Sequence, residues 1–104
     1  MEKEDYEDIL GKFRILKEAM LKSAKYRESQ VASGAAINAY ANLTAVEAEV
    51  KGGAILAKDS QIEILKQASF VGSTENESHH GKAQNANAFA NLVRAQISLG
   101  KLTP

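Results

Sequence analysis

The segment from Ser29 to Val46 contains no charged side chain, although one quarter of the residues in this chain are charged. When residues 32–50 are read as a helix, apolar side chains recur on one face at steps of four and three residues. This stripe comprises Ala32, Ala36, Ala39, Leu43, Val46 and Val50. An exposed helix face normally carries Lys and Glu, which pair with one another four residues apart. We therefore expect this helix to be covered on more than one side, by its own chain or by another copy.

The segment is nevertheless too polar to serve as a membrane span, because a span needs about 20 predominantly apolar residues. Its polar side chains are Ser29, Gln30, Ser33, Asn38, Asn42 and Thr44. The first eight residues are acidic and lack an apolar run, so we expect no signal peptide. A cytoplasmic location is the default expectation, and export without a leader remains the alternative.

Length and composition predict a single all-α domain over residues 1–104. The chain has no cysteine, its formal net charge is zero, and its only proline is the last residue, Pro104. Frequent alanine and few β-branched runs favour helix over strand. We expect a three- to four-helix antiparallel bundle or an extended helical hairpin, with seams like those of coiled coils.

The apolar periodicity and the positions of helix-ending residues predict four helices at about residues 5–28, 30–51, 54–71 and 83–99. Whether residues 5–51 form one helix or two stays open, although Ser29 would be a suitable N-cap for a second helix. Gly52 and Gly53 favour a break after residue 51. The predicted inner side of the third helix carries Ile55, Ile62, Leu65 and either Ala68 or Ser69. Residues 72–82 are polar and aperiodic, which predicts a mobile loop.

The two helices that are poor in charge suggest an interaction seam. Because residues 30–51 and 83–99 both lack the charged outer face that a monomeric bundle shows to water, we expect part of their surface to contact another chain. The expected partner is a second copy, in a dimer or a larger assembly, or a helical protein. The residues proposed for this seam are Ala36, Ala39, Tyr40, Leu43, Val46, Phe89, Leu92 and Val93.

Two weaker patterns define alternative functions. The basic residues Arg14, Lys22 and Lys25 share an arc of the first helix and could contact phosphates, as in a small nucleic-acid-associated regulator. Few such contacts predict weak, salt-sensitive binding, and Glu18 lies in the middle of the arc. Glu77 and His80 have the Glu-x-x-His spacing that dimeric metal carboxylate proteins use. Here the spacing occurs once, in a stretch that reads as a loop, so we expect no bound metal.

No motif in the sequence predicts catalysis or a cofactor. There is no Gly-rich phosphate loop, and no pair of carboxylates lies in an apolar setting. We therefore expect a non-enzymatic helical interaction protein, such as a small assembly subunit, an adaptor or a chaperone-like partner, that associates with itself.

Overall fold

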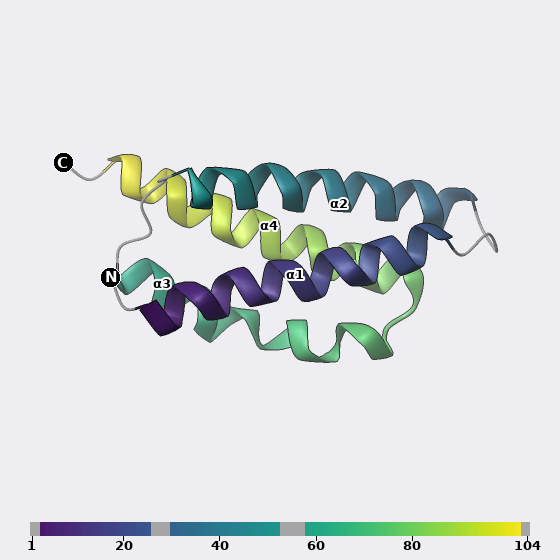
Figure 1. The fold of residues 1–104 in the computed structure, drawn as a ribbon, viewed down its shortest axis with the longest axis horizontal. Helices are drawn as coiled ribbons and strands as arrows, with labels where there is room; N and C mark the ends of the chain where they lie inside the picture. Colours follow the sequence, from purple (N-terminus) through teal and green to yellow (C-terminus); the bar gives the residue numbers. More distant parts are fainter. Residues whose placement is uncertain (1–2, 26–29, 53–57, 103–104) are drawn as a thin grey trace.

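The computed structural model describes residues 3–25, 30–52 and 58–102 of the chain. These residues form α1 (Lys3–Lys25), α2 (Gln30–Lys51), α3 (Lys58–Gln67), the 3₁₀ helix η1 (Ala68–Asn76) and α4 (His79–Leu102) (Figure 1). α1, α3 and η1 run in one direction along a rod of 48 × 21 × 17 Å, and α2 and α4 run in the other. The predicted all-α class is confirmed. No helix in the described ranges has both the length and the apolar character needed for a membrane crossing.

The helices pack as a bundle and not as an extended hairpin. α2 contacts α1 and α4, whereas α3 and η1 cover the opposite side of α1 and α4. α2 and α4 are neighbours that run in the same direction, from the right to the left of Figure 1. Residues 5–51 therefore form two helices that fold back on each other. The proposed N-cap, Ser29, lies outside the described residues.

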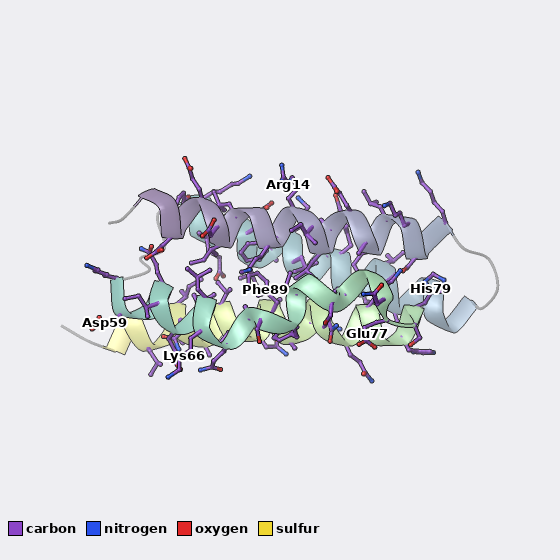
Figure 2. The ribbon with its side chains drawn as sticks, turned by 90° about the horizontal axis from the view of Figure 1, so that it is seen from below. Arg14, Asp59, Lys66, Glu77, His79 and Phe89 are labelled. Carbon is purple, nitrogen blue, oxygen red and sulfur yellow. The ribbon has the colours of Figure 1, made fainter. Side chains whose placement is uncertain are left out.

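The core is built from the apolar faces of α1, α2 and α4. α1 buries Ile9, Phe13, Leu16 and Met20, each with no exposed surface. The rings of Phe13 and Phe89 meet edge to face near the middle of the bundle, with centroids 4.9 Å apart and planes at 72°. Figure 2 shows Phe89 lying between the helices while Arg14 projects from the outer side of α1. This aromatic contact joins α1 to α4.

The predicted apolar side of α3 is confirmed at Leu65, which packs against the core, and is wrong at Ile62. Ile62 is 48% exposed, whereas Gln61 and Ile64 are buried. A hydrophobicity pattern assigns a glutamine to the solvent side, so it shifted the predicted stripe onto Ile62. The side chain of Gln61 instead lies in the interior, where tertiary packing overrides the pattern. Ile55 lies outside the described residues.

The segment predicted as a loop over residues 72–82 is largely helical. η1 continues to Asn76, and α4 begins at His79. Ala68, Val71 and Thr74 are buried, and their spacing of three residues matches the period of a 3₁₀ helix. The Thr74 hydroxyl donates a hydrogen bond to the Phe70 carbonyl oxygen at 3.4 Å. It also accepts one from Asn85 Nδ2 at 3.3 Å. The hydrogen bond from Asn85 joins η1 to α4, a contact that the polar composition of the segment did not predict.

Ser78 immediately precedes α4. The helix begins at His79, four residues before its predicted start at residue 83. Its Oγ accepts a hydrogen bond from the Gly81 backbone N–H at 3.1 Å, and its carbonyl oxygen accepts one from the Lys82 N–H at 2.8 Å. A serine that binds the N–H three residues ahead is a helix N-cap. The cap satisfies a donor that the first turn would otherwise leave without a partner.

Loss of this cap should destabilise the bundle measurably. We expect Ser78→Ala to lower the free energy of unfolding by about 1 kcal/mol, the usual effect of removing a serine cap. Urea unfolding followed by circular dichroism measures the change. Ser69→Ala is a suitable control, because Ser69 is exposed within η1. Equal stabilities for the two variants would contradict the capping role.

Candidate functional site

The residues proposed as an interaction seam lie inside the chain, which corrects their assignment. Ala36, Ala39, Leu43 and Val46 of α2 have no exposed surface, and Phe89 and Val93 of α4 have none either. Tyr40 and Leu92 are half-buried and pack against the same core. Periodicity identified these positions as buried but gave no information about which helix covers them. The helices of the same chain do so, and within this set only Tyr40 and Leu92 keep partly exposed side chains.

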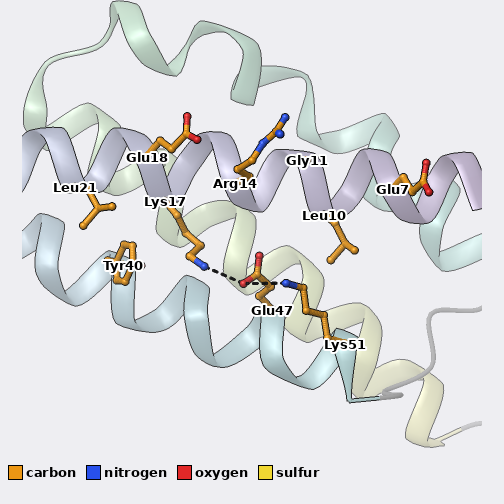
Figure 3. Close-up of a pocket in the computed structure, with 10 residues that line it drawn as sticks. All are labelled: Glu7, Leu10, Gly11, Arg14, Lys17, Glu18, Leu21, Tyr40, Glu47 and Lys51. Atoms are coloured by element: carbon orange, nitrogen blue, oxygen red, sulfur yellow. Dashed lines mark hydrogen bonds and ion pairs between the residues drawn. The ribbon is translucent and has the colours of Figure 1, made fainter.

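A groove of about 530 Å³ runs along the outer side of α1 and α2 (Figure 3). Leu10, Leu21 and Tyr40 contribute apolar walls. At its floor, Lys17 Nζ lies 2.9 Å from Glu47 Oε1, and Lys51 Nζ lies 3.8 Å from the same oxygen. The Lys17 ammonium is also 5.6 Å from the centre of the Tyr40 ring. Two ammonium groups hold the Glu47 carboxylate, so its contacts tie α1 to α2.

Glu47 should contribute to stability. It is 8% exposed, so removal of its charge would leave the Lys17 ammonium in a partly buried place without its carboxylate. We expect Glu47→Gln to lower the free energy of unfolding by about 1–2 kcal/mol, between the values for exposed and for buried ion pairs. Urea unfolding tests this, with Glu18→Gln on the exposed rim of the groove as the control. A loss no larger than that of the control would contradict a structural role for the Glu47 contacts.

A second surface lies on the line where α2 and α4 meet. Asn42 Nδ2 donates a hydrogen bond to Asn87 Oδ1 at 3.1 Å, across the two helices. Arg94 Nη2 donates to Asn42 Oδ1 at 2.6 Å, and Arg94 Nη1 lies 3.4 Å from Asn91 Oδ1. One guanidinium and three amides thus link the two helices at the surface. Every position in this network is exposed or half-buried.

Helix spacing extends this network into a face that we call the α2–α4 face. Asn42 shares a stripe of α2 with positions four residues before it and three and seven residues after it. Asn87, Asn91 and Arg94 continue in the same way to Ser98 on α4. The α2–α4 face comprises Asn38, Asn42, Ala45 and Glu49 of α2 and Asn87, Asn91, Arg94 and Ser98 of α4.

The surface of α2 differs from that of α1 in charge. The exposed side chains of α1 between Asp5 and Lys25 number eight, and six of them are charged. Between Gly34 and Ala48, α2 exposes six side chains, none of which is charged. Among the described residues, the two most exposed large apolar side chains also belong to α2 and α4: Ile37 at 58% and Leu99 at 55%.

The basic residues proposed for phosphate contacts are all exposed on α1. Arg14 lines the α1–α2 groove together with Glu7 and Glu18. Lys22 lines a smaller hollow of about 280 Å³, which Glu18 also lines. Acidic groups therefore lie beside these bases, and an anionic ligand would meet both signs of charge. Nucleic-acid binding through this helix stays a prediction.

The residues considered for metal binding occupy two different elements. Glu77 has extended backbone after η1, with φ −86° and ψ 160°, and His80 is exposed in the first turn of α4. They do not form a pair on one helix. Within the described parts of the chain, no three His, Cys, Asp or Glu side chains gather closely enough to hold a metal ion.

One polar pair was missed by the sequence reading. His79 Nδ1 and Ser23 Oγ are 2.8 Å apart and join the first residue of α4 to the end of α1. Ser23 is 1% exposed, so its hydroxyl cannot be reached by a substrate as a nucleophile would have to be. The pair connects residues 56 positions apart in the chain, a separation at which local patterns predict nothing.

Comparison of the chain with family models, curated proteins and solved structures found no match.

Proposed function

We propose that the protein is a non-enzymatic helical interaction module whose α2–α4 face binds a second copy of the chain. Such a module can serve as a small assembly subunit, an adaptor or a chaperone-like partner. The observation that supports the proposal is the absence of charge at the exposed positions of α2 from Gly34 to Ala48, beside a strongly charged α1. The centres of protein interfaces are likewise depleted of charged residues.

The physical reason is the difference in desolvation cost between charges and amides. A charged side chain that leaves water without a partner is strongly destabilising, whereas an amide needs only hydrogen bonds to replace those it made with water. Asparagine both donates and accepts, so the amides of the α2–α4 face can find partners on an identical surface. Small side chains such as Ala45 also allow a neighbouring helix to approach closely.

Neighbouring positions of α2 provide the test. Ala45 lies on the α2–α4 face, whereas Thr44 is exposed four residues after Tyr40 and three before Glu47, which line the α1–α2 groove. Lysine is well tolerated in helices, so both Ala45→Lys and Thr44→Lys should fold. We expect Ala45→Lys to raise the dissociation constant of the assembly about tenfold or more, because its ammonium would be desolvated at the contact.

Light scattering at matched concentrations gives the mass of each variant. The wild-type protein and Thr44→Lys should have a mass above that of one chain, whereas Ala45→Lys should shift toward one chain. An unchanged assembly in Ala45→Lys, with the helical signal intact, would exclude the α2–α4 face as the contact.

A further inference from the structure

We infer that two copies dock with two-fold symmetry, so that Arg94 of each chain pairs with Glu49 of the other. This inference rests on the proposed function and specifies the geometry of the same surface. It starts from the two charges on the α2–α4 face, one of each sign, which are both exposed. The remaining members of the face are asparagine, alanine and serine.

The two charges lie toward the same end of the face. Glu49 follows Asn42 by seven residues, which places it on the same side of α2 about 10 Å further along the helix. Arg94 reaches Asn42 from α4 through the 2.6 Å hydrogen bond. Because α2 and α4 run in the same direction, Arg94 also follows Asn87 by two turns toward the same end.

The guanidinium of Arg94 is held in place without a carboxylate. Two of its nitrogens contact the amide oxygens of Asn42 and Asn91. The ion pairs of Glu47 with Lys17 and Lys51 include neither Arg94 nor Glu49. Arginine has five N–H donors in a rigid plane, so donors remain for a carboxylate that approaches from outside.

A second copy fits these two charges better than an acidic peptide does. An acidic peptide would provide a carboxylate for Arg94 but would bring a further negative charge toward Glu49. In a two-fold dimer each contact occurs twice with the roles exchanged. A two-fold axis that lies in the plane of the contact, midway between Arg94 and Glu49, therefore brings Glu49 of each copy to Arg94 of the other, and both charges are paired.

Mixing two charge-reversal variants tests this arrangement. Arg94→Glu leaves two acidic residues on the face, and Glu49→Arg leaves two basic residues. Each variant alone should dimerise with a dissociation constant at least about tenfold above that of the wild type, because like charges would meet across the axis. A 1:1 mixture should form a heterodimer of nearly wild-type affinity, since every contact then joins an acid to a base.

Light scattering and native mass spectrometry of each variant and of the mixture read out the result. Glu18→Arg, which reverses an exposed charge on α1 away from this face, should dimerise like the wild type. If both variants dimerise as well as the wild type, or if the mixture forms no heterodimer, the pairing is wrong while self-association stands. A wild-type protein that stays monomeric overturns the pairing and the proposed function together. An ion pair within one chain is also excluded by the heterodimer, since mixing could not restore it.

Discussion

Leu43→Lys is expected to unfold the chain, and not merely to dissociate an assembly of folded subunits. Leu43 has no exposed surface and lies in the core with Ala39 and Val46. Replacing it removes a leucine contact worth about 2–5 kcal/mol and buries an ammonium whose desolvation costs several kcal/mol more. A domain of this kind is stable by only about 5–15 kcal/mol in total.

Circular dichroism measures this outcome directly. The helical signal of Leu43→Lys should be largely lost at 25 °C, whereas Thr44→Lys, one residue later and exposed, should keep it. Together with Ala45→Lys, lysine at three consecutive positions should give three different results: unfolding, no effect and dissociation. A Leu43→Lys protein with full helical content would contradict the placement of this stripe inside the bundle.

Phe89→Ala should cause the second large loss of stability. Phe89 is fully buried, and its ring packs edge to face on Phe13 with centroids 4.9 Å apart. Truncation of a buried phenylalanine costs about 3–5 kcal/mol, because it removes apolar contacts and leaves a cavity. Urea unfolding should show this loss, and the half-buried Leu92 should lose less on truncation to alanine.

A double-mutant cycle separates the ring contact from the cavity. An aromatic pair of this geometry contributes about 0.5–1.5 kcal/mol beyond the area it buries. The losses of Phe13→Ala and Phe89→Ala should therefore fail to add in the double variant. Additive losses would mean that the two rings stabilise the bundle independently.

The sequence predicted the long helices well because their burial is periodic. The bounds of α2 agree with the predicted residues 30–51, and the stripe from Ala36 to Val50 is buried as expected. In α4, Phe89 and Val93, which the sequence placed in a covered seam, are buried as well. Such faces repeat over several turns, so one misplaced residue does not change the pattern.

The prediction failed where a short element has a different period. Ala68, Val71 and Thr74 pack inward every third residue, and a polar composition concealed this pattern in η1. The start of α4 depended on a single serine, Ser78, that the composition of the segment made look like part of a loop. The order Ser-x-x-Gly gives no periodic signal, although a serine before a helix is a recognised cap.

The candidate surface could be predicted only in part. The low charge of α2 and α4 was evident from the sequence, but the buried stripe was mistaken for the contact. Apolar periodicity identifies the side of a helix that is covered and contains no information about the chain that covers it. The link from Arg94 to Asn42 joins residues 52 positions apart and required the packing of α2 beside α4.

The mass of the wild-type protein in solution tests self-association most directly. Light scattering should be measured from low to high micromolar concentration, with the helical content recorded in parallel. We expect a mass of at least two chains at the upper end, decreasing toward one chain on dilution. A well-folded protein with the mass of one chain, 11.2 kDa, at every concentration would contradict self-association through the α2–α4 face.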